Sequence, residues 1–70
     1  MIKITHLDNQ ESMLNAELIE AVDATPDTLI TLITGRKLMV KESVDEVVAA
    51  IKKYKKDIFS AFLDDVKHGK

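Results

Sequence analysis

The stretch "DATPDTLITLITGRKLMVKES", residues 23–43, decides the fold of this 70-residue chain. Residues 28–34 (TLITLIT) are rich in β-branched residues and apolar on both faces, which predicts a strand at the centre of a small sheet. Residues 36–41 predict a returning strand with Leu38 and Val40 facing inward, and Gly35 supplies the positive φ that the intervening hairpin needs. Residues 25–28, with proline in second place, are typical of a type I turn. The stretch therefore predicts consecutive antiparallel strands that carry no catalytic residue.

The residues before this stretch predict further strands. Residues 1–7 alternate between apolar and polar side chains, residues 8–11 have turn chemistry, and residues 12–15 predict a short strand paired with the first. Residues 16–24 favour a helix by propensity alone, but their short length indicates a helical turn at 15–18 and a strand at 19–24. We therefore expect a small antiparallel sheet of four or five strands, and a barrel-like closure of that sheet is left open.

The hydrophobic period changes after residue 42. Ser43 and Glu46 have the spacing of a helix capping box, and apolar residues then recur at intervals of three and four. The pattern predicts one amphipathic helix over 43–67, roughly 35 Å long. The fold class is α+β in a single domain over 1–70, with a sheet region at 1–42, this long C-terminal helix and a frayed tail at 68–70.

The predicted helix is longer than the sheet it covers, because strands of five or six residues span only about 17–20 Å. Apolar side chains past the middle of the helix would then lack cover, although burying each is worth roughly 1.5–3 kcal/mol. A chain this small, without cysteine, also gains stability from association, and the commonest partner is a second copy. We expect a homo-oligomer or partner interface formed by Tyr54, Ile58, Phe59, Phe62, Leu63 and Val66.

A cluster of lysines at 52–56 is the main basic feature of the chain. A contact face for nucleic acid would combine Lys52, Lys53, Lys55 and Lys56 with Arg36 and Lys37. The formal net charge of −2 does not favour nucleic acid as a partner. Lysines that flank an apolar helical stripe are more often a solvated face, so a small nucleic-acid-binding regulator is the second hypothesis.

The sequence contains no recognisable chemical motif. It has no cysteine, and its two histidines, His6 and His68, lack ligand spacing. The acidic residues lack the spacing of a calcium loop, and no serine belongs to a nucleophile motif. We expect a protein without enzymatic activity, cofactor, metal or small-molecule substrate. The lack of a membrane-spanning run or a signal-peptide pattern predicts a cytoplasmic location.

The order of these features resembles the FlbD/SwrD family of small flagellar and swarming-motility proteins. The resemblance covers about residues 1–55, and its most characteristic pieces are "LN" at 14–15, "IE" at 19–20, "ATPDTLITL" at 24–32, "GRK" at 35–37 and "VKES" at 40–43. Members often have Asn-Gly at the hairpin where this chain has Thr34-Gly35. The resemblance implies a non-catalytic accessory protein that supports flagellar motor power and swarming, with motor, stator or export components as partners. It also allows a place at the inner face of the membrane at the flagellar base.

A second, partial resemblance concerns the fold alone. Residues 19–48 are similar to the strand–turn–strand–helix half of LytTR-type DNA-binding domains. It belongs with the nucleic-acid hypothesis.

Overall fold

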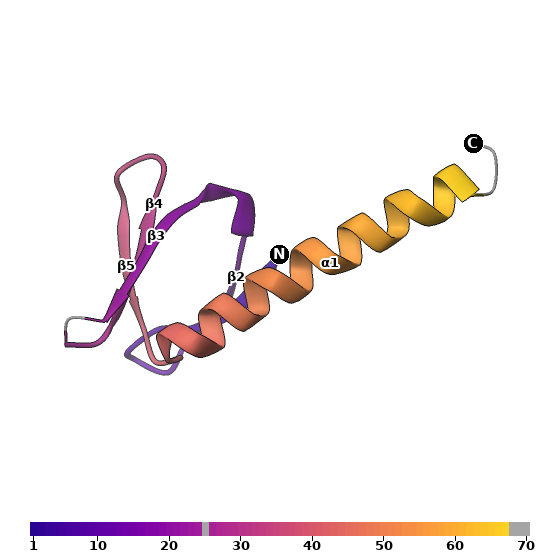
Figure 1. Cartoon of the computed structure of the whole chain (residues 1–70). Helices are drawn as coiled ribbons and strands as arrows, with labels where there is room; N and C mark the ends of the chain where they lie inside the picture. Colours follow the sequence, from indigo (N-terminus) through magenta and orange to yellow (C-terminus); the bar gives the residue numbers. More distant parts are fainter. Residues whose placement is uncertain (25, 68–70) are drawn as a thin grey trace.

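The structure is a computed structural model that describes residues 1–24 and 26–67. The strands are β1 (Ile2–Thr5), β2 (Glu11–Leu14), β3 (Ile19–Ala24), β4 (Thr28–Leu32) and β5 (Lys37–Val40). A 3-10 turn, η1 (Ala16–Leu18), precedes β3, and the long helix α1 (Val44–Lys67) follows β5. Figure 1 shows the strands gathered at one end and α1 running away from them. The α+β class with one long C-terminal helix is therefore confirmed.

The larger sheet has the order β3-β4-β5 and is antiparallel throughout. Its central strand is β4, as the β-branched run predicts, and Ile30 there is completely buried. The strand is shorter than predicted, because Ile33 and Thr34 belong to the turn and only residues 28–32 pair. Gly35 has a φ of 92° in that turn, and its N–H donates to the carbonyl of Leu32 at 2.8 Å. The turn predicted at 25–28 includes Thr25, which lies outside the described residues.

The smaller sheet is the β1–β2 hairpin, with Ile2 opposite Leu14 and Thr5 opposite Glu11. Asn9 in its turn has a φ of 71°, which asparagine tolerates better than most residues. The two sheets meet where His6 forms a bridge with Val40 and the N–H of Lys41 donates to the carbonyl of Thr5 at 2.8 Å.

The barrel-like alternative is wrong, because the strands form two small sheets and no closed barrel. Closure would require β2 to pair with β3. The 3-10 turn η1 stands between them, held by the Asn15 side chain, which accepts a hydrogen bond from the N–H of Glu17 at 3.0 Å. The helix α1 contacts both β1 and β3 instead, so a helix covers the opening between the sheets.

The start of α1 is the predicted capping box. The N–H of Ser43 donates to the Glu46 carboxylate at 3.0 Å, and the N–H of Glu46 donates to the Ser43 hydroxyl at 3.1 Å. From this start, Val47 is buried in the core, and Ala50, Ile51 and Tyr54 pack against it half-buried. The buried core itself consists of Ile2, Ile4, Ala16, Ile30, Leu32, Val40 and Val47. Only the first half of α1 contributes to this core.

Glu42 ties the β1 strand to the start of the helix. Its carboxylate accepts hydrogen bonds from the Thr5 N–H at 2.9 Å and from the Thr5 hydroxyl at 2.7 Å. Partial burial alone raises the pKa of this carboxyl, but the hydrogen bonds from Thr5 outweigh it, so the pKa lies below its ordinary value of 4.5. The ionised form therefore stabilises the fold above about pH 4.5, and this contribution is lost as the pH falls through the lowered pKa.

We expect Glu42→Gln to destabilise the protein by about 0.5–1 kcal/mol at pH 7, a value discounted because the carboxylate is partly in contact with water. The difference from the unchanged protein should shrink below pH 4.5, where protonation removes the same interaction. Urea unfolding of both proteins at pH 7 and pH 3 measures this. The exposed Glu20 supplies the control, because Glu20→Gln should have little effect at either pH. A Glu42→Gln penalty that is equal at both pH values would contradict the assignment.

Candidate interaction surface

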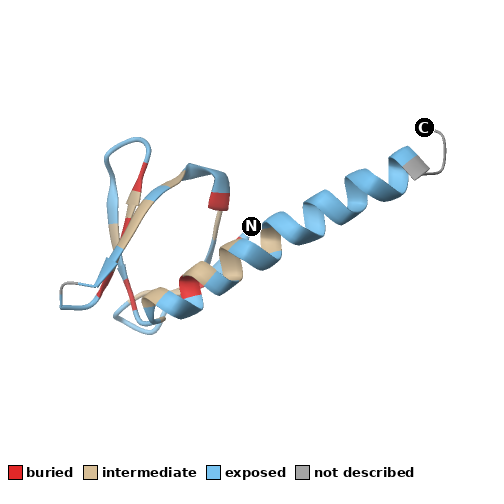
Figure 2. Ribbon diagram, in the orientation of Figure 1, coloured by how far each residue is buried: buried red, intermediate tan, exposed pale blue. Residues whose placement is uncertain are grey.

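The second half of α1 carries a row of apolar side chains that its own sheets do not cover. We call this row the tail surface; its members and exposed fractions are Ile58 (50%), Phe59 (60%), Phe62 (60%), Leu63 (42%) and Val66 (56%). In Figure 2 this half of the helix is exposed and projects beyond the strands. The molecule is correspondingly elongated, with extents of 48 × 22 × 18 Å. The predicted overhang is present.

The tail surface is not a straight continuation of the face that covers the sheets. At 3.6 residues per turn, its centre is rotated by roughly 100° around the helix from the line through Val47 and Tyr54. On the tail, that earlier line passes between Ile58 and Ala61 and reaches Asp65, so Ile58 lies at the border of the two faces. A lengthening of the sheet would therefore not cover Phe59 or Leu63. The tail surface faces a direction of its own.

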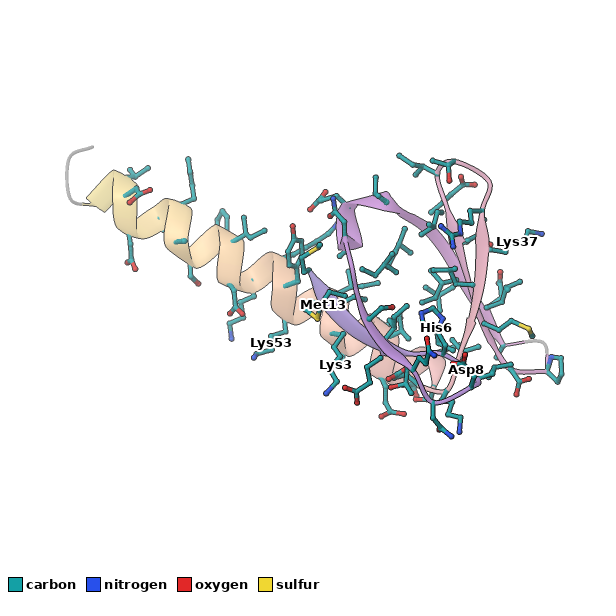
Figure 3. The ribbon with its side chains drawn as sticks, turned by 180° about the vertical axis from the view of Figure 1, so that it is seen from behind. Lys3, His6, Asp8, Met13, Lys37 and Lys53 are labelled. Atoms are coloured by element: carbon teal, nitrogen blue, oxygen red, sulfur yellow. The ribbon has the colours of Figure 1, made fainter. Side chains whose placement is uncertain are left out.

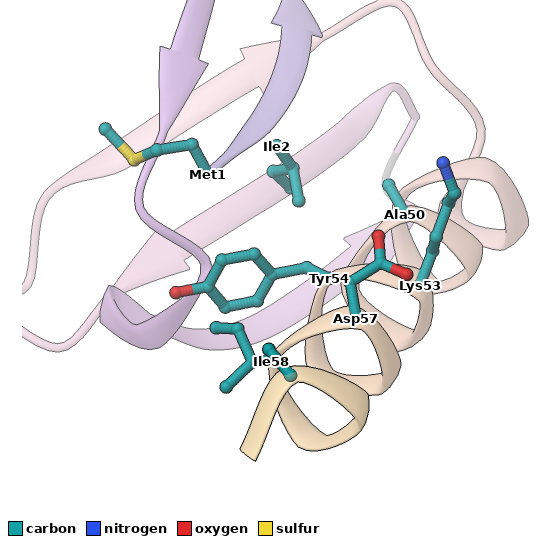
Figure 4. A pocket seen from close by; sticks show the side chains of 8 residues that line it. Met1, Ile2, Ala50, Lys53, Tyr54, Asp57 and Ile58 are labelled. Atoms are coloured by element: carbon teal, nitrogen blue, oxygen red, sulfur yellow. The ribbon is translucent and has the colours of Figure 1, made fainter. Parts of the chain in front are cut away.

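Tyr54, which the sequence grouped with the tail, has different surroundings. It is half-buried and packs against the core, and it lines a shallow groove of about 380 Å³ beside Met1 and Ile2. Figure 4 shows the Tyr54 ring lying between these N-terminal residues and Ile58. This groove was not predictable from the sequence, because the position of Met1 beside α1 is a long-range contact. The part of the groove that α1 contributes could have been predicted from the helical spacing of Ala50, Tyr54, Ile58 and Ala61.

The six basic residues of the nucleic-acid hypothesis are all exposed but do not gather on one face. Arg36 and Lys37 lie at the β4–β5 turn, whereas the four lysines 52, 53, 55 and 56 lie on α1. In Figure 3 the labelled Lys37 and Lys53 lie well apart, with the β1–β2 hairpin between them in the view. The structure therefore offers two separate small basic patches, and contact of either with a ligand stays a prediction.

The described residues contain no group of three His, Cys, Asp or Glu side chains placed to hold a metal ion. His6 is within 2.8 Å of the Ser12 hydroxyl through its Nε2 atom, in an exposed setting between the hairpin strands. His68 lies outside the described residues. Within residues 1–24 and 26–67, no helix is both long and apolar enough to cross a membrane.

These features define a small α+β protein with an exposed apolar surface, the tail surface, on the second half of its helix. Residues 1–59 match the family model of FlbD, the flagellar and swarming motility proteins. The match covers most of the chain, so this protein belongs to the FlbD family. No curated protein and no solved structure gave a significant match. The family match ends at Phe59, so most of the tail surface lies beyond it.

Proposed function

We propose that this protein is a non-catalytic flagellar accessory protein that supports motor power and swarming through protein–protein contacts, as a homo-oligomer. The family supports a role in flagellar and swarming motility. The observation that carries the rest of the proposal is the exposed tail surface, with Phe59 and Phe62 both 60% exposed. An apolar row of this size on a small protein is typical of an interaction site.

The tail surface joins copies of the chain, and the assembled protein binds a motor, stator or export component at the cytoplasmic side of the flagellar base. Such a role requires no catalytic group. The arrangement of short strands around a seven-residue buried core supplies a rigid base from which the helix projects. A nucleic-acid-binding role would need one continuous basic surface, which the separated positions of Lys37 and Lys53 do not favour.

The test is motility in a flagellated cell whose own copy is replaced by a variant carrying Phe59→Ser and Phe62→Ser. We expect filaments in normal number but slower swimming and reduced swarming, because motor power and not filament assembly would be impaired. A matched control carries Ser60→Ala, which lies on the opposite side of the same helical segment, and should swarm normally. Full swarming by the Phe59/Phe62 variant would overturn the proposal.

A further inference from the structure

We infer that the tail surface of one copy packs against that of a second copy in an antiparallel helix pair, with Lys55 of each copy beside Asp65 of the other. This inference rests on the self-association proposed above and adds the orientation and register of the two helices. It is carried by the charge order of α1, by the residues at the end of the helix and by the spacing of the tail surface.

The charges along α1 after Ile51 are segregated. Residues 52–56 contain four lysines, and residues 57–66 contain three aspartates and no basic residue. In a parallel pair, the lysines of one helix would lie beside the same lysines of the other helix and repel them. An antiparallel pair can place Lys55 and Lys56 of each helix at the level of Asp65 of the other, so complementary charge favours the antiparallel orientation.

The acidic residues are also in an unfavourable place within a single chain. Asp64 and Asp65 lie within the last turn of α1, which ends at Lys67. Carboxylates there oppose the negative end of the helix dipole, where basic residues are preferred. Lysines supplied by a second, antiparallel helix would lie next to this end and offset the repulsion. Within α1, Lys67 is the one basic residue after Lys56, and it shares the last turn with two aspartates.

The spacing of the tail surface selects a register. Residues 55, 59, 62 and 66 follow a four-three-four interval, the spacing of a seam between two packed helices. Placing Phe59 of one copy opposite Phe62 of the other buries both aromatic pairs at the centre. The same register puts Lys55 opposite Val66, with the neighbouring Asp65 within reach of the flexible lysine side chain. By symmetry the ion pair forms twice.

The available area suits a second copy. The five side chains of the tail surface expose on the order of 500 Å², so two copies would bury about 1,000 Å², near the lower limit for a specific interface. The rotation of the tail surface away from the sheet-covering face lets the second helix run alongside α1 without meeting the strands. An anionic lipid surface suits the tail less well, because its three aspartates would be repelled by the headgroups.

Cysteine cross-linking of the full chain tests the orientation, since the natural sequence has no cysteine. A mixture of the Lys55→Cys and Val66→Cys variants should form the mixed disulfide under mild oxidation. Val66→Cys alone should form little, because the antiparallel register separates the two copies of residue 66 by roughly 16 Å along the helices, beyond disulfide reach. The control Ser60→Cys, on the opposite side of the helix, should not cross-link.

Charge reversal tests the ion pair. Lys55→Glu and Asp65→Lys should each weaken dimerisation by roughly 3–10-fold, and the combined variant should return to within about twofold of the original. Both sites are exposed and distant from the core, so folding should be unaffected.

Efficient self-linkage of Val66→Cys, or a combined variant weaker than either single one, would overturn the antiparallel pair while leaving self-association intact. A monomeric mass at all concentrations with no disulfide from any mixture would overturn self-association as well. Sedimentation of the monomeric protein with phosphatidylglycerol vesicles, lost on replacing Phe59 and Phe62 by serine, would assign the tail surface to a membrane and so overturn the inference.

Discussion

Replacing Ile30 by alanine will lower the free energy of unfolding by about 3 kcal/mol, a large part of the roughly 4–10 kcal/mol expected for a domain of this size. Ile30 is completely buried at the centre of β4, between β3 and β5, so its truncation leaves a cavity in the core. The melting temperature should fall by roughly 10–25 °C. Thermal unfolding followed by circular dichroism, at a concentration held constant between samples, measures the change.

The chain offers a matched control three residues away. Ile33 is 59% exposed in the β4–β5 turn, and its backbone N–H bond to the carbonyl of Leu18, at 2.8 Å, does not depend on its side chain. Ile33→Ala removes the same atoms from a position that buries little, so it should shift the melting temperature by only a few degrees. Equal losses at the two positions would mean that β4 does not occupy the centre of the core.

The elements whose signals are local were predictable from the sequence. The 3-10 turn at 16–18 and β3 at 19–24 lie where the short length of their segment placed them, and the helix starts at Val44, as the capping box predicts. The end of β4 was harder to predict from the sequence. Ile33 and Thr34 have strand propensity, and they do not pair with β5 only because the chain turns at Gly35. Propensity describes each residue in isolation, whereas a ladder ends where its partner strand turns away.

The contacts that join distant segments were not predictable. Thr5 and Glu42 are 37 residues apart, and neither has a sequence neighbour that indicates the other. The same holds for the groove between Met1 and Tyr54 and for the split into two sheets, which depends on where η1 directs the chain. The exposure of the tail surface was predictable, because the helix is longer than the strands that it covers. Its rotation away from the sheet-covering face was also present in the spacing of residues 58–66.

The variant that combines Phe59→Ser with Phe62→Ser will be a folded monomer, whereas the unchanged protein will be a concentration-dependent dimer. Each copy loses two aromatic side chains that the helix pair would bury at its centre, and each burial is worth roughly 1.5–3 kcal/mol, so dimerisation should weaken at least 100-fold. Sedimentation velocity over a range of concentrations should show only the 7.8 kDa species for the variant.

The stability of the variant shows whether the two phenylalanines pack within the monomer or only between copies. Neither belongs to the packed cluster of the monomer. Under conditions where both proteins are monomeric, urea unfolding should give the same free energy for each within about 0.5 kcal/mol. The control Ser60→Ala should keep the dimer, since that position lies opposite the tail surface. A dimer that survives the loss of both phenylalanines would place the contact elsewhere, because the charged rim alone contributes too little to hold two helices together.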